Sequence, residues 1–180
     1  MADITDGKDP GLGSTLQRLI AALVHRGISI ATAESLTAGQ LAAHLADVPG
    51  ASAVLDGGVV AYQSRIKREV LGVPGELLEC RGAVDPEVAL EMARGARAVF
   101  RCGLGIATTG VAGPEPHEGK EVGTVMIAVV GSLSRNPDEA ESVRAVRELH
   151  LEGDRAEIRH ATVRACVELV GDVLTGVTPA

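Results

Sequence analysis

The chain has 180 residues, a length that suits a single domain with a sizeable core. Hydrophobic residues make up 46% of the chain but aromatic residues only 1%, so the core must be aliphatic. So few aromatic side chains, together with a formal net charge of −7, argue against a nucleic-acid partner.

No apolar run is long enough to span a membrane, and the first residues lack the apolar core of a signal peptide. These features predict a cytoplasmic protein with no membrane partner. Three cysteines, Cys80, Cys102 and Cys166, have neither the spacing of zinc ligands nor that of a disulfide framework. We therefore expect them to be small buried hydrophobic residues.

The first part of the chain predicts a leader followed by alternating helices and strands. Residues 1–13 are expected to form a flexible leader, and residues 14–176 a single domain. Ser14 or Thr15 is expected to cap a helix that runs to Arg26 and carries its apolar residues on one face. The next expected elements are a buried strand over 28–34, a helix over 38–47, a strand over 53–62 and a short helix from Ser64 to Leu71.

The second part continues the alternation. Asp85-Pro86-Glu87 combines an N-cap, a proline at the first helical position and an early acid, which predicts a helix to about Phe100. The remaining expected elements are a strand over 103–109, a Gly- and Pro-rich loop over 110–121, strands over 122–130 and 143–151 separated by a polar turn, and a helix from Asp154 to about Leu174. This order predicts an α/β sandwich with a largely parallel sheet.

Residues 29–39 join a buried strand to a helix through Glu34-Ser35. A hydroxyl at such a junction projects from the strand end, close to the free N–H groups of the following helix. Ser35 is therefore a candidate nucleophile with oxyanion donors nearby. The alternative interpretation is that Ser35 or Thr37 only caps the helix.

Tyr62 ends a predicted strand, and Lys67 lies about one turn into the next helix. A lysine beside a serine hydroxyl acts as a general base if burial lowers its pKa enough to leave it neutral. Taken alone, Lys67 would be a solvated charge, and Tyr62 a side chain with an apolar body and a solvated hydroxyl.

Two more segments carry candidate ligand-binding residues. The stretch from Thr108 to Pro114 allows a ligand to approach the backbone, although it would also serve as an ordinary turn. His117, in the loop that follows, lacks neighbours at metal-ligand spacing, so we expect no metal site. Arg155 and Arg159 share a helix face, where a pair of guanidiniums would hold a phosphate or simply be solvated.

Taken together, these segments resemble the CinA C-terminal domain family, whose members include nicotinamide mononucleotide amidohydrolases. The resemblance runs from about residue 14 to 175 in the family's order. The matching stretches are Ala33-Glu-Ser-Leu-Thr-Ala-Gly39, Val48-Pro-Gly-Ala-Ser52, Gly57-Gly-Val-Val-Ala-Tyr62 with Lys67, Leu71-Gly-Val73, Gly82-Ala-Val84, Thr109-Gly-Val-Ala-Gly-Pro114, Val122-Gly-Thr124 and Gly153-Asp-Arg155.

The resemblance implies a three-layer α/β/α sandwich, a homodimer, and hydrolysis of the carboxamide of nicotinamide mononucleotide to nicotinic acid mononucleotide and ammonia. It implies no metal and no organic cofactor. Ser35 matches the family's nucleophile, Lys67 its base, and Tyr62 the tyrosine that supports them. Substrate contacts are expected at Glu34, Thr37, Thr109, Gly110, Gly113, Arg155 and Arg159, with Arg159 holding the phosphate.

The chain also departs from the family. It has Leu36 where the family usually has Cys, Ala38 where it usually has Gly, and an altered loop over 115–121. Two other hypotheses therefore stay open. One is a non-catalytic nucleotide-binding or regulatory module that retains the pocket, and the other is an amidase of another small amide, which the altered loop favours.

Overall fold

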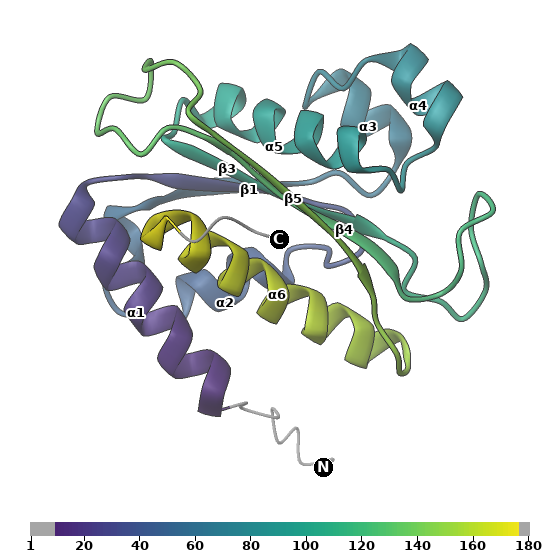
Figure 1. The fold of residues 1–180 in the computed structure, drawn as a ribbon, viewed down its shortest axis with the longest axis horizontal. Helices are drawn as coiled ribbons and strands as arrows, with labels where there is room; N and C mark the ends of the chain where they lie inside the picture. The colour runs from purple at the N-terminus through teal and green to yellow at the C-terminus, as the bar shows by residue number, and fades with distance from the viewer. Residues whose placement is uncertain (1–9, 177–180) are drawn as a thin grey trace, which may run out of the picture.

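The computed structural model describes residues 10–176, in which a five-stranded sheet lies between two layers of helices (Figure 1). The strands are β1 (Ile30–Glu34), β2 (Leu55–Val60), β3 (Leu104–Gly110), β4 (Thr124–Gly131) and β5 (Val143–His150). The helices are α1 (Pro10–Arg26), α2 (Gln40–Ala46), α3 (Ser64–Glu69), α4 (Gly75–Arg81), α5 (Pro86–Phe100) and α6 (Arg155–Thr175), with a 3₁₀ turn, η1, at Ala51–Ala53.

The strand order in the sheet is β2-β1-β3-β4-β5. Strand β1 pairs in parallel with both β2 and β3, whereas β4 runs antiparallel to β3 and β5. Four of the five strands therefore run in the same direction and only β4 runs in the opposite one, so the sheet is mixed but mostly parallel. This arrangement confirms the predicted α/β/α sandwich, and it brings the carboxyl ends of β2, β1 and β3 to one edge of the sheet.

Helices α1, α2 and α6 cover one face of the sheet, and α3, α4 and α5 cover the other (Figure 1). Leu, Ile and Val dominate the first layer, while Ala is frequent in the second, as the aliphatic composition predicts. The second layer is tightly packed at Gly105 on β3, where a Cβ would collide with the carbonyl of Ala93 on α5. The small residues therefore let α5 lie close against the sheet.

The structure corrects three expectations. Helix α1 begins at Pro10, so residues 10–13 of the predicted leader are helical, because Leu12 is buried one turn before Leu16 on the same apolar face. Residues 1–9 lie outside the described part of the chain. Helix α4 is missing from the prediction, and its Cys80 is exposed, whereas Cys102 and Cys166 are buried as expected.

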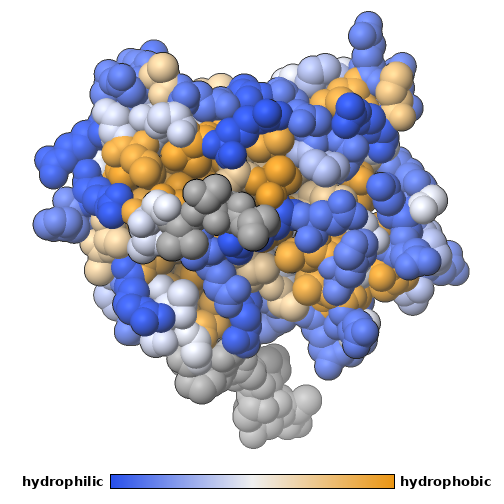
Figure 2. Space-filling view, in the orientation of Figure 1, coloured by the Kyte–Doolittle hydropathy of each residue, from blue (hydrophilic) through white to orange (hydrophobic). Residues whose placement is uncertain are grey.

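Figure 2 shows apolar residues interspersed with hydrophilic ones on the side of the molecule seen in Figure 1. Within residues 10–176, no helix combines the length and the apolar character needed to cross a bilayer.

Candidate active site

Seven of the predicted site residues gather where the carboxyl ends of three neighbouring strands meet. Ser35 directly follows β1, and its N–H donates to the carbonyl of Thr108 on β3 at 2.9 Å. On the other side, the N–H of Ala61 donates to the carbonyl of Glu34 at 2.8 Å. Ligands of open α/β sheets bind at this edge, so the topology alone brings Ser35, Tyr62 and Thr109 to a common site.

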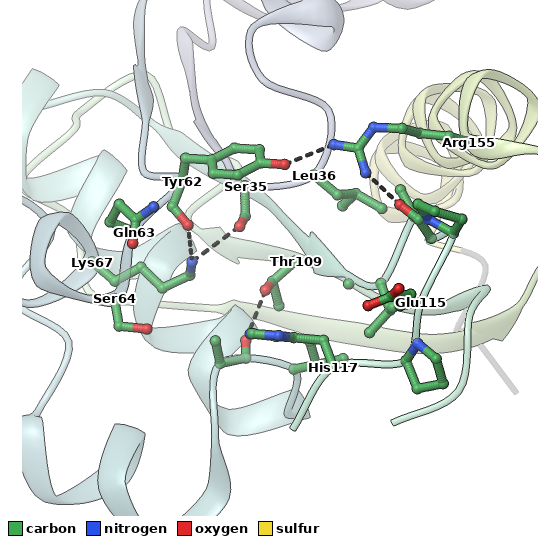
Figure 3. Close-up of a pocket in the computed structure, with 18 residues that line it drawn as sticks. Ser35, Leu36, Tyr62, Gln63, Ser64, Lys67, Thr109, Glu115, His117 and Arg155 are labelled. Atoms are coloured by element: carbon green, nitrogen blue, oxygen red, sulfur yellow. Dashed lines mark hydrogen bonds between the residues drawn. The ribbon is translucent and has the colours of Figure 1, made fainter. Parts of the chain in front are cut away.

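Lys67, in the first turn of α3, directs its amine to Ser35 (Figure 3). Its Nζ donates to the Ser35 Oγ at 3.0 Å, to the carbonyl oxygen of Ala61 at 2.9 Å and to that of Tyr62 at 3.4 Å. The side chain is only 1% exposed, so it is not the solvated helix charge that the sequence alone would allow. The two backbone carbonyls fix the amine beside the hydroxyl.

Burial lowers the pKa of Lys67 from 10.5 to about 8, while the negative charge of Glu118 acts in the opposite direction and raises it. Among the described residues, Lys67 forms no ion pair with a carboxylate. A substantial fraction of the amine is therefore neutral at mildly alkaline pH. A neutral amine at hydrogen-bonding distance is able to accept the proton of the Ser35 hydroxyl.

Ser35 and Lys67 lie in a pocket of about 400 Å³ that is open to solvent. Its volume falls in the range of roughly 300–1,000 Å³ that is usual for small-molecule sites. Seven of the ten predicted site residues line it: Ser35, Tyr62, Lys67, Thr109, Gly110, Gly113 and Arg155. The loop after β3 adds Glu115 and His117 on the wall across from Ser35 (Figure 3).

Arg155, at the start of α6, bridges two walls of the pocket (Figure 3). One terminal nitrogen donates to the Tyr62 hydroxyl at 2.7 Å and the other to the carbonyl oxygen of Gly113 at 2.6 Å. The Tyr62 hydroxyl therefore faces Arg155, and Tyr62 contacts Lys67 through its backbone carbonyl instead. In this structure, Tyr62 thus supports Lys67 through its backbone carbonyl and not through its hydroxyl, a choice that the prediction leaves open.

Ala83 and Glu118 support the opposite wall of the pocket and were not predicted from the sequence. The Thr109 hydroxyl donates to the carbonyl of Ala83 at 2.7 Å, and the N–H of Ala83 donates to the Glu118 carboxylate at 2.6 Å. These bonds join the segment before α5 to β3 and to the loop that follows it. No local motif marks Glu118, because its partner is 35 residues away.

Glu34 does not line the pocket, although it was expected to contact substrate. Its buried carboxylate accepts hydrogen bonds from the N–H groups of Gly39, Leu41 and Ala42 at the start of α2. The N-cap residue of α2 is Gly39, and no side chain bonds from that position. The alternative in which Ser35 or Thr37 caps this helix is therefore wrong, since Glu34 satisfies these donors from the preceding strand.

Thr37 and Arg159 also lie outside the pocket lining. The hydroxyls of Thr37 and Thr108 form a buried hydrogen bond of 2.7 Å. Arg159 donates from Nε to the carbonyl of Leu36 and from a terminal nitrogen to the carbonyl of Thr37, both at 2.9 Å. The structure thus brings Thr37 and Arg159 to the back of the turn that presents Ser35, and only Arg155 of the predicted arginine pair lines the pocket.

Metal ligands are not gathered at this site. Over residues 10–176, no group of three or more His, Cys, Asp or Glu side chains has a geometry that would hold a metal ion. The Cys102 thiol is remote from the pocket lining, and burial raises its pKa to about 12, so it is a poor nucleophile.

Comparison with known proteins identifies relatives over nearly the whole chain. A family model described as the CinA C-terminal domain matches residues 13–174. A CinA-like protein of Mycobacterium avium is 45% identical over 164 residues, which cover 91% of this chain and 37% of that protein. A CinA-like protein of Frankia casuarinae is 42% identical over 175 residues, which cover 97% of this chain and 38% of the relative.

Solved structures agree with the sequence matches. The crystal structure of the competence/damage inducible protein CihA from Agrobacterium tumefaciens superposes with a TM-score of 0.82 at 35% identity, covering 91% of this chain and 95% of that one. The chain spans less than two fifths of the length of the curated relatives named above. Because the family model covers most of its length, the chain belongs to the CinA C-terminal domain family.

Proposed function

We propose that the protein hydrolyses the carboxamide of nicotinamide mononucleotide, giving nicotinic acid mononucleotide and ammonia. One observation carries the proposal: the buried amine of Lys67 lies 3.0 Å from the Ser35 hydroxyl at the floor of an open pocket. This is the geometry that an amine base and a serine nucleophile need. The family resemblance supplies the substrate.

In the proposed reaction, the Ser35 Oγ attacks the carboxamide carbon while Lys67 takes the hydroxyl proton. The resulting tetrahedral intermediate collapses, its C–N bond breaks, and the leaving nitrogen takes the proton back from Lys67 and departs as ammonia. Water then attacks the acyl-enzyme ester, Lys67 accepts its proton, and Ser35 regains that proton as the C–O bond breaks. Backbone N–H groups after Ser35 hold the negative oxygen of both intermediates.

A purely binding module is disfavoured by the burial of Lys67. Enclosing an amine without a carboxylate partner lowers stability, and a module that only binds nucleotide gains nothing from holding that amine beside a serine. An amidase of another small amide remains the second candidate. Glu115 and His117, which line the pocket from the loop that departs from the family, support it because they would contact a different substrate.

The direct test measures ammonia release by the purified protein from nicotinamide mononucleotide, nicotinamide riboside, nicotinamide and unrelated small amides. We expect the mononucleotide to be hydrolysed fastest, and Ser35→Ala to abolish the reaction while the fold is kept. Hydrolysis of a different amide would select the second candidate. Binding of the mononucleotide without any ammonia release would select the non-catalytic module.

A further inference from the structure

The loop over residues 114–121 carries a tight hairpin at its tip. The N–H of His117 donates to the carbonyl of Lys120 at 3.1 Å, and the N–H of Lys120 donates back to the carbonyl of His117 at 2.9 Å. Between them, Glu118 and Gly119 have φ values of 48° and 73°, the positive sign that a type I′ turn requires. Asn, Asp or Gly is usual at such positions, and a residue with a larger side chain stays there where other contacts hold it. Local turn chemistry therefore does not account for Glu118.

The side chain of Glu118 makes a tertiary contact instead. One carboxylate oxygen accepts from the N–H of Ala83 at 2.6 Å, and the other lies 3.7 Å from the His117 Nε2. A Cβ at position 82 would lie 2.6 Å from the first oxygen, so Gly82 leaves the carboxylate room to come this close. Within residues 10–176, no other residue of 114–120 forms a hydrogen bond to a residue outside this loop. Glu118 is thus the polar link between the hairpin and the segment before α5.

This link belongs to the pocket wall across from Ser35 (Figure 3). The carbonyl of Ala83 accepts from the Thr109 hydroxyl on β3, and its N–H donates to Glu118 in the hairpin. Ala83, Thr109 and His117 all line the pocket. Glu118 does not line it, so its carboxylate acts on the pocket through the residues that it holds.

We propose that Glu118 is a positioning residue, which latches the hairpin to Ala83 and so fixes the wall that contacts the part of the nucleotide beyond its carboxamide. The proposal rests on the proposed function, which supplies the nucleotide. A wall that is ordered before binding saves the substrate the cost of ordering it. Without the latch, only a fraction of the molecules would hold the wall in place, and the apparent affinity would fall in proportion to that fraction. The attack by Ser35 should not change, since the carbonyls of Ala61 and Tyr62 hold Lys67 independently of the hairpin.

Three variants of the full chain separate the latch from the charge. Glu118→Ala removes the acceptor, whereas Glu118→Gln keeps an oxygen that accepts from the N–H of Ala83. Glu121→Ala is the matched control, because it removes an exposed acid from the same loop. Burial lowers the pKa of Lys67 and the charge of Glu118 raises it, so rates are compared on the alkaline plateau, where Lys67 is neutral in every protein.

Hydrogen exchange of the Ala83 N–H, followed by nuclear magnetic resonance without ligand, measures the latch itself. We expect exchange to be faster by about tenfold in Glu118→Ala, because the amide loses its acceptor, and to be close to the wild-type rate in the other two variants. Unchanged exchange in Glu118→Ala overturns the latch.

Ammonia release from nicotinamide mononucleotide measures the effect on recognition. In Glu118→Ala we expect KM to rise by about 5- to 20-fold and kcat to stay within about threefold, the pattern of lost binding, while Glu118→Gln and Glu121→Ala keep the wild-type KM. A short alkyl fluorophosphonate checks the reacting pair: the Ser35 Oγ bonds to phosphorus, the P–F bond breaks, fluoride leaves and the hydroxyl proton passes to Lys67. This small probe should label all four proteins at the same rate.

Several results would overturn the role in recognition. Faster exchange with an unchanged KM would do so, and so would a lower kcat or slower labelling, because Glu118 would then support the reacting pair. An equal rise of KM in Glu118→Gln and Glu118→Ala would assign the effect to charge and not to the bond. If the wild type releases no ammonia from the mononucleotide, the proposed function fails and the role in recognition fails with it, while exchange at Ala83 still decides whether Glu118 holds the hairpin.

Discussion

The guanidinium of Arg155 donates a hydrogen bond to the Tyr62 hydroxyl across 2.7 Å. Tyr62 stands between β2 and α3, and Arg155 begins α6, so the bond joins the segment that leads to Lys67 with the last helix of the chain. Tyr62 is 48% exposed, and its ring forms part of the pocket wall (Figure 3). The hydroxyl therefore shapes the site from its rim and is bonded to Arg155, not to the Ser35 hydroxyl or the Lys67 amine.

Tyr62→Phe should have a small effect on turnover. The change removes the acceptor for Arg155 but keeps the backbone carbonyl that holds Lys67, so we expect kcat to fall by less than about tenfold, equivalent to one ordinary hydrogen bond. Steady-state rates over a pH series would check this. A loss of more than a hundredfold, or a shifted pH midpoint, would show that the phenol takes part in the chemistry.

The rate should rise with pH as Lys67 loses its proton. Because burial lowers the pKa of Lys67 to about 8, kcat/KM of the free enzyme should increase through a midpoint near that value and level off above it. Lys67→Met, which is similar in length but cannot accept a proton, should lose most activity at every pH. A flat profile in the wild type between mildly acidic and mildly alkaline pH would exclude a lysine base.

The same residue should leave a signature in the stability of the fold. Between pH 8 and 10.5 the unfolded chain holds a proton on Lys67 that the folded chain has released, so the free energy of unfolding rises with pH in that window. Relative to Lys67→Met, the wild type should gain about 3 kcal/mol across it, at roughly 1.4 kcal/mol per pKa unit. Urea titrations of both proteins at several pH values would measure the difference. If the free energy of unfolding depended on pH in the same way in both proteins, folding would not lower the pKa of Lys67.

Arg155 should be the cation that recognises the substrate phosphate, because it is the arginine of the predicted pair that lines the pocket. Arg155→Ala should weaken binding of nicotinamide mononucleotide by about 1.5–3 kcal/mol, the usual range for a charged hydrogen bond, and hardly affect nicotinamide riboside. Calorimetric titration with both ligands would test this. Equal losses for the two ligands would mean that Arg155 only braces Tyr62 and Gly113.

Glu34→Gln should destabilise the protein without altering the pocket lining. One carboxylate oxygen of Glu34 accepts from both Gly39 and Leu41, and the other accepts from Ala42. In glutamine, an NH₂ group replaces one of these two oxygens, and at either position it would face a backbone N–H donor. We therefore expect a loss of about 1–3 kcal/mol in the free energy of unfolding. Thermal unfolding would measure it, with Glu34→Asp as a control that keeps the charge but shortens the reach.

Local patterns predicted most of the elements and brought Ser35 and Lys67 to the same site. The buried strand before Ser35 and the position of Lys67 one turn into α3 follow from residue spacing, and parallel strands then bring both to one edge. Prediction was poorer for long-range partners. Nothing near Arg159 in the sequence indicates that its donors bond the carbonyls of Leu36 and Thr37, and nothing near Glu34 distinguishes a buried helix cap from a ligand contact.

The bonds of Arg159 to the turn connect points 122 and 123 residues apart in the chain. Ribosomes add about 5–20 residues per second, so the segment with Ser35 is made on the order of ten seconds before the helix that completes its surroundings. A nascent chain thus carries Ser35 throughout the synthesis of the intervening residues without the arginine that orders the neighbouring backbone. Termination just before α6 would yield a fragment lacking both Arg155 and Arg159, in which neither the pocket rim nor the back of the turn is closed.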